Sequence, residues 1–125
     1  MLRIKSAQVA VLGRTFVDDF VERMVVHLGT YFPRPCGALG QDGLRALIRR
    51  GIERAQGHGI ASERDVCVFL GLMLTFGEDF DKALPWARAI VRDRDLIDGH
   101  DRIDRLADAG EEHEHEASDG AGTGT

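Results

Sequence analysis

The feature that most constrains the fold is an uncharged run of eleven residues, Val66 to Phe76. Nearly every position in the run is apolar, so a helix formed by it has no face suited to water and belongs inside a larger core. The run is too short to cross a bilayer, which requires about 20 apolar residues. Ser62 and Asp65 precede it with the spacing of an approximate capping box, which predicts that the helix begins at Ser62.

Helical periodicity recurs on both sides of this run. Apolar residues share one stripe from Ser6 to Leu28 and again from Gly43 to Gly57, and a shorter helix with Pro85 in its first turn is expected from Leu84 to about Arg92. A last, weaker helical piece follows and is interrupted by Gly99. No alternating strand pattern is present, so the sequence predicts an all-α fold of four to five helices around the central buried helix.

Two segments lack this periodicity. Residues 32–42 contain two prolines and two glycines, which predicts a loop. From Gly110 onward the chain carries five acidic residues, no Lys or Arg, and no apolar period, which predicts a disordered acidic tail. The length of 125 residues indicates one domain, so we expect a single helical domain over 1–109 and a tail over 110–125.

The charge distribution excludes some classes of partner. The chain has 21 acidic and 16 basic residues, and removal of the five acids of the tail leaves 16 of each. A formally neutral body offers no electrostatic footprint for nucleic acid and no broad attraction to an anionic membrane surface. The first residues lack the apolar core of a signal peptide, and two cysteines make no disulfide framework, so a cytoplasmic location is expected.

Four residues are candidates for binding a protein partner. Trp86 is the one tryptophan, and tryptophan is enriched at the centres of interfaces, although packing at the edge of the core is the alternative interpretation. Phe32 lies in the predicted loop. Arg49 and Arg50 belong to an arginine-rich helix that reads mainly as a solvated face, but both can contact an acidic partner.

Glu78, Asp79 and Asp81 form the candidate metal or acid–base site. Three neighbouring carboxylates can hold Ca²⁺ or Mg²⁺ or transfer protons, with His58 or His100 as additional groups. The spacing of an EF-hand loop is absent, and acidic residues are ordinary in a surface turn, where an arginine can pair with them. No other motif requires a cofactor, and none is expected.

Several short segments carry a resemblance to a known group of proteins. The chain is similar, from its first helix to Trp86, to small helical bacterial proteins encoded near type VI secretion and polymorphic-toxin genes. The similarity is carried by the segments RGIERA (50–55), GHGI (57–60), SERDV (62–66), FGEDFD (76–81) and LPWA (84–87). The resemblance implies a cytoplasmic accessory protein that acts beside a secreted effector or its delivery apparatus.

These observations favour a protein without enzymatic activity. The leading hypothesis is an interaction module, an adaptor or chaperone-like protein that holds an effector or spike component. One alternative is a divalent-metal protein or enzyme that uses the carboxylates of residues 78–81. Another is an immunity protein that neutralises a toxin by covering it, which the sequence does not separate from an adaptor. The oligomeric state is left open.

Overall fold

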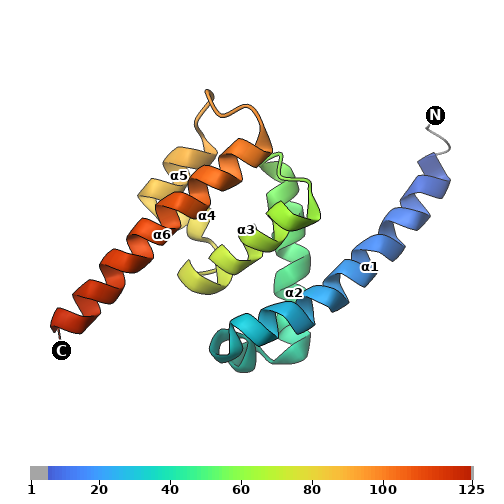
Figure 1. Ribbon diagram of the computed structural model, residues 1–125. Coiled ribbons are helices and arrows are strands. Elements are labelled where there is room, and N and C mark those ends of the chain that lie inside the picture. The colour runs from blue at the N-terminus through green and yellow to red at the C-terminus, as the bar shows by residue number, and fades with distance from the viewer. Residues whose placement is uncertain (1–5, 125) are drawn as a thin grey trace. The chain divides into compact units, whose positions relative to one another are not determined.

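The computed structural model describes the backbone from residue 6 to residue 124 and side chains from residue 16 to residue 114 (Figure 1). This part of the chain contains six helices and no strand, so the predicted all-α fold is confirmed. None of the described helices is long and apolar enough to cross a membrane. The helices are α1 (Ser6–Tyr31), α2 (Pro33–Gly57), α3 (Glu63–Phe76), α4 (Phe80–Ala83), α5 (Pro85–Val91) and α6 (Gly99–Gly124).

The chain forms two compact units, residues 1–49 and residues 50–125, where the length predicted a single helical domain over 1–109. The boundary falls inside α2, between Arg49 and Arg50. Because the division lies inside a helix, helix-forming residues occupy both sides of it. The sequence there has no segment with the composition of a linker. The sequence therefore gives no signal for the division, and we describe the two units separately.

In the first unit, α1 pairs with the early part of α2 through ion pairs. The Arg45 guanidinium donates two hydrogen bonds to the Glu22 carboxylate, at 2.7 and 3.0 Å, and these bonds are the main reason that the pKa of Glu22 is lowered. The predicted apolar stripe of α1 is buried at Phe20, Met24 and Leu28, whereas Phe16 is 66% exposed. The helix continues past Leu28 to Tyr31, three residues further than predicted.

The predicted loop over residues 32–42 is wrong, because α2 begins at Pro33. Pro33 and Pro35 lie in the first turn of this helix, where the missing N–H has no intrahelical partner to lose and the fixed φ of proline suits a helix. The irregular backbone is confined to Gly40, which has φ 75° and ψ 168°. A residue with a Cβ rarely adopts that conformation, so the glycine marks a kink inside α2.

The second unit is built around α3, as the uncharged run predicts. The Ser62 hydroxyl accepts a hydrogen bond from the Asp65 N–H at 3.1 Å, and the helix ends where Gly77 donates its N–H to the Met73 carbonyl. Phe69 and Leu70 have no exposed surface. Helix α3 packs against α4 and α6, and α5 packs against α4 and α6, so α4 and α6 cover the central helix and α5 lies against these two (Figure 1).

Helix α6 runs through Gly110, where the sequence predicted the domain to end and a tail to begin. Gly110 is buried beside Leu72 and Phe76, and the His113 ring stacks on Trp86 with the ring centroids 4.8 Å apart. Helix α6 thus continues past residue 110 because a small residue at this position lets it pass close to α3. The side chains of the acidic segment after Glu114 lie outside the described residues. Gly99, predicted to interrupt the last helix, begins it.

Candidate functional site

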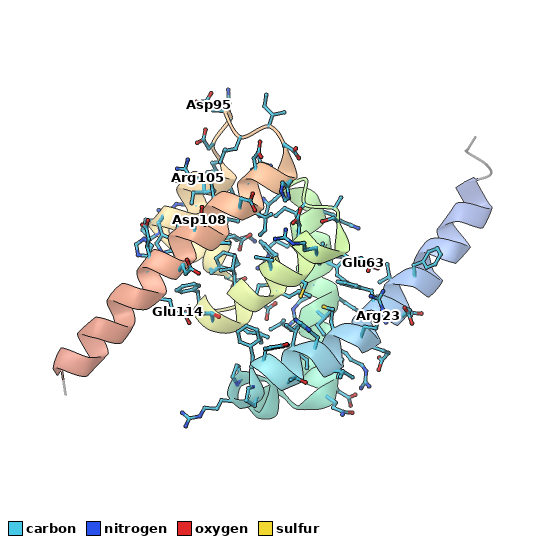
Figure 2. The ribbon with its side chains drawn as sticks, viewed as in Figure 1. Arg23, Glu63, Asp95, Arg105, Asp108 and Glu114 are labelled. Carbon is cyan, nitrogen blue, oxygen red and sulfur yellow. The ribbon has the colours of Figure 1, made fainter. Side chains whose placement is uncertain are left out.

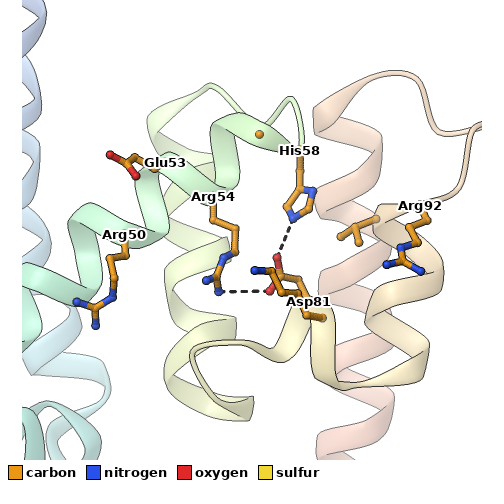
Figure 3. Close-up of a pocket in the computed structure, with 9 residues that line it drawn as sticks. Arg50, Glu53, Arg54, His58, Asp81 and Arg92 are labelled. Atoms are coloured by element: carbon orange, nitrogen blue, oxygen red, sulfur yellow. Dashed lines mark hydrogen bonds and ion pairs between the residues drawn. The ribbon is translucent and has the colours of Figure 1, made fainter.

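The second unit has an open pocket of about 570 Å³ (Figure 3). Its residues come from the last two turns of α2, from α4 and from the end of α5. They are Arg50, Glu53, Arg54, Gly57, His58, Asp81, Lys82, Val91 and Arg92. Most of these side chains are charged, whereas sites for small drug-like molecules are lined mainly by apolar and aromatic groups. The pocket is therefore suited to charged ligand groups.

Asp81 lies at the centre of the polar interactions in this pocket. Its carboxylate is 1% exposed and lies 2.8 Å from His58 Nε2 and 3.4 Å from Arg54 Nη1 (Figure 3). The neighbouring Phe80 is buried against Phe69, with the ring centroids 5.3 Å apart, and this packing holds the short helix α4 against α3. Burial of the carboxylate is tolerated because cationic or hydrogen-bonding groups satisfy it.

The three carboxylates of the candidate metal site, Glu78, Asp79 and Asp81, pair with arginines in the structure and do not form the predicted metal site. Glu78 accepts a hydrogen bond from Arg50 Nη2 at 2.8 Å, and its bonds with Arg50 hold the pKa of this carboxyl below its ordinary value. Asp79 lies 3.1 Å from Arg54 Nη2. Each carboxylate thus faces a cation. Among the residues with described side chains, no three His, Cys, Asp or Glu groups gather in a way that could hold a metal ion.

Arg54 is a site residue that sequence reasoning missed, whereas His58 was expected only as an additional group beside the carboxylates of residues 78–81. Arg50, Arg54 and His58 are spaced by four residues and so share one face of α2. This row faces the acidic segment 78–81. The sequence contains two features that could have indicated this pairing. They are the row of basic residues at a spacing of four and the acidic segment at residues 78–81. It was hidden because other arginines spread the charge of α2 over more than half of its helical wheel.

The four residues predicted to bind a partner do not gather at one site. Arg49 donates a hydrogen bond to Asp18 at 2.7 Å within the first unit, where Phe32 is half-buried at the junction of α1 and α2. Trp86 is half-buried, with an edge-to-face contact to Phe76 at 5.3 Å. Arg50 alone lines the pocket. The pocket therefore includes one of the four predicted partner-binding residues.

Both cysteines are free thiols. Cys36 is buried, and burial raises its pKa, as it does for Cys67. A raised pKa reduces the thiolate fraction, which is the nucleophilic form, so neither residue has the environment of an activated nucleophile.

A second polar pair joins α3 to α6. His100 Nδ1 lies 2.9 Å from the Asp65 carboxylate, which is buried. The bond from Asp65, with the nearby charge of Asp104, raises the pKa of His100 above its ordinary value of 6.5. Burial acts to raise the pKa of Asp65, but its bonds with His100 and Ser62 outweigh burial, and the pKa falls below 3.8.

This pair predicts a pH dependence of stability. Because the pKa of His100 is raised on folding, its contribution is complete below about pH 6.5 and is lost as the pH rises through the folded-state value. Because the pKa of Asp65 is lowered on folding, its contribution is complete above about pH 3.8 and is lost as the pH falls. We expect the free energy of unfolding from this pair to be greatest between these limits.

Urea unfolding across this pH range, followed by Trp86 fluorescence, measures the effect. Trp86 belongs to the second unit and is the one tryptophan, so its signal reports on that unit. His100→Asn is expected to flatten the loss of stability above pH 6.5, because it keeps a donor near the position of Nδ1 without the titrating charge. An unchanged pH profile in this variant would contradict the assignment.

Asp81→Ala is expected to destabilise the second unit by about 2 kcal/mol. Removal of one member of a buried ion pair costs about 3–5 kcal/mol, and the value is reduced here because Arg54 and His58 are each about one-fifth exposed. Asp79→Ala is the matched control, since its exposed carboxylate also pairs with Arg54. It is expected to change stability by less than about 0.5 kcal/mol. Equal losses in both variants would show that burial of Asp81 is unimportant.

Comparison of the chain with protein-family models, with curated proteins and with solved structures gives no match. The site is therefore interpreted from its own geometry and chemistry.

Proposed function

We propose that this protein is a non-enzymatic interaction module, an adaptor or chaperone-like accessory protein, and that its partner binds over the pocket of the second unit. The observation that supports the proposal is the charged lining of this open pocket, which includes Arg50. Protein partners present charged side chains on extended segments, and complementary charges across an interface set orientation and specificity. The resemblance noted in the sequence suggests a secreted effector or spike component as the partner, met in the cytoplasm.

The proposal is tested by site-specific photocrosslinking in the full chain. A photoreactive amino acid replaces Glu53, an exposed residue of the pocket, or Asp108, an exposed residue of α6 that does not line it (Figure 2). Each variant is co-expressed with the products of neighbouring genes. A crosslink to one of these products from position 53 but not from position 108 would support the proposal. If no neighbouring product crosslinks or co-purifies, the adaptor function is rejected.

A second candidate function, catalysis by general base, is favoured by the pair formed by His58 and Asp81. A buried carboxylate that holds an imidazole in one orientation is a recurring arrangement around catalytic histidines. Figure 3 shows the other ring nitrogen of His58 pointing away from Asp81. In a hydrolysis, this nitrogen would take a proton from water as the water oxygen bonds to the substrate phosphorus, the bond from phosphorus to the leaving oxygen would break, and the protonated ring would return its proton to that oxygen.

Turnover of a chromogenic phosphodiester, bis(p-nitrophenyl) phosphate, tests this candidate. Activity that disappears in His58→Ala and persists in His27→Ala would support it, because His27 is an exposed histidine of the first unit. If the wild-type protein shows no turnover, catalysis is rejected. The pair then has only a structural role, which is to join the end of α2 to α4.

A further inference from the structure

Two cations of the pocket have no partner among the side chains that the structure describes. Arg50 and Arg54 are engaged by acidic side chains of the segment 78–81. Among the residues with described side chains, no hydrogen bond or ion pair involves the side chain of Lys82 or Arg92, and both residues are exposed. Lys82 comes from α4 and Arg92 from the end of α5. Two different elements thus each direct a free cation to the same pocket.

The lining as a whole has an excess of positive charge. Four cations, Arg50, Arg54, Lys82 and Arg92, face two carboxylates, Glu53 and Asp81, so the formal charge is +4 − 2 = +2 with His58 neutral. Glu78 and Asp79 lie outside the lining and pair with Arg50 and Arg54, so the lining cations left without a carboxylate among the described side chains are Lys82 and Arg92. An occupant that brings about two negative charges would complete the pairing, which is the complementarity expected of a specific interface.

The chemistry of the lining also decides between classes of anion. The phosphates of a nucleic acid carry one charge for about every 1.7 Å of duplex, and proteins that bind it typically neutralise several phosphates with Lys and Arg. The two free cations are too few, and Glu53 and Asp81 would repel a continuous run of phosphates. A short peptide fits better, because its carboxylates are spaced along the chain and its amides can lie beside the acidic groups.

We infer that the pocket binds a short acidic segment of the partner protein, with Lys82 and Arg92 pairing with its Asp or Glu carboxylates. The inference rests on the proposed function and specifies the partner's chemistry. Lys82 presents a flexible ammonium, and Arg92 presents a planar guanidinium that can hold a carboxylate through two hydrogen bonds. Because both cations are exposed, the binding is expected to weaken strongly with salt.

The probe is a fluorescein-labelled hexaglutamate peptide, titrated with the full-length protein and followed by fluorescence anisotropy. We expect binding that weakens between about 50 and about 300 mM NaCl, and none to a labelled hexalysine peptide. The double variant Lys82→Glu, Arg92→Glu is expected to lower the affinity by about tenfold or more, since each change replaces an attraction by a repulsion. Circular dichroism of the variant at matched temperature checks that it remains folded.

Arg105→Glu is the matched control for the change of charge. Arg105 is exposed on α6 and does not line the pocket (Figure 2). This variant is expected to bind hexaglutamate within about twofold of the wild-type protein, because Arg105 contributes no charge to the pocket lining and isolated exposed charges contribute little.

Three results would overturn the inference. They are no binding of hexaglutamate by the wild-type protein, equal binding by the double variant, and tighter binding of an RNA oligonucleotide than of the peptide. These failures are distinct from failure of the adaptor function. If a partner crosslinks at position 53 but hexaglutamate does not bind, the proposal of an interaction module stands. Only the inference that its ligand is acidic is then rejected.

Discussion

Gly99→Ala is expected to destabilise the second unit by about 3 kcal/mol or more, which is at the upper end of the cost of overpacking. An added Cβ at this position would lie 1.8 Å from the Gly59 carbonyl oxygen and 2.9 Å from the Ile60 nitrogen. These are backbone atoms, so no change of side-chain rotamer removes the clash. The start of α6 and the turn after α2 would have to separate.

The surrounding contacts make that separation costly. The Arg102 guanidinium of α6 donates hydrogen bonds to the carbonyl oxygens of His58 and Leu96, which fixes the turn after α2 against the loop before α6. His58 also holds Asp81 in the pocket. We therefore expect Gly99→Ala to weaken hexaglutamate binding together with stability, since the turn that carries His58 must move.

The control for this prediction is Gly57→Ala. A Cβ at Gly57 would have no atom within 4 Å, so the same chemical change meets open space. It is expected to shift stability by less than about 1 kcal/mol. Urea denaturation followed by Trp86 fluorescence compares the two variants. Similar midpoints for both would mean that the close approach of Gly59 and Gly99 does not exist in solution.

Leu70→Asp is expected to leave the second unit largely unfolded at room temperature. Leu70 has no exposed surface, and a carboxylate there would be buried without a partner in the core around α3. The loss of the buried side chain costs about 2–5 kcal/mol and desolvation of the new polar group adds to it, against a total stability of about 5–15 kcal/mol for a typical domain.

Thr75→Asp on the same helix provides the comparison. Thr75 is exposed, and its hydroxyl donates to the Gly71 carbonyl, so the substitution loses one surface hydrogen bond. The expected loss is about 1 kcal/mol or less. Circular dichroism and Trp86 fluorescence report the folded fraction. A cooperative unfolding transition of Leu70→Asp at wild-type midpoint would show that α3 is not the centre of the core.

The central helix is the element that the sequence defines best. Its boundaries follow from local chemistry, because Ser62 caps its first turn and Gly77 ends it, and its burial follows from eleven residues without a charge. Pro85 at the first turn of α5 is a signal of the same local kind. In contrast, the prolines at 33 and 35 predict a loop where the structure has the first turn of α2, because proline is compatible with a loop and with the first turn of a helix alike.

The candidate site was predictable only in part. The acidic segment 78–81 and Arg50 were identified from composition and spacing. Their relation to each other was not, because an ion pair between residues 28 positions apart, such as Arg50 and Glu78, depends on how two helices pack. The same segment that suggested a metal site therefore became, on folding, the set of carboxylates that engages the cations of α2.

The sequence by itself determined that the fold is helical, where the central helix begins and ends, and that this helix is buried, because periodicity, capping and charge act over a few residues. Only the tertiary structure decided that α6 passes Gly110 to reach Trp86, that the chain divides within α2, and that Arg54 is paired while no described side chain pairs with Lys82 or Arg92. These outcomes depend on distances between residues remote in the chain. Such distances are set by packing of the whole unit rather than by any local pattern.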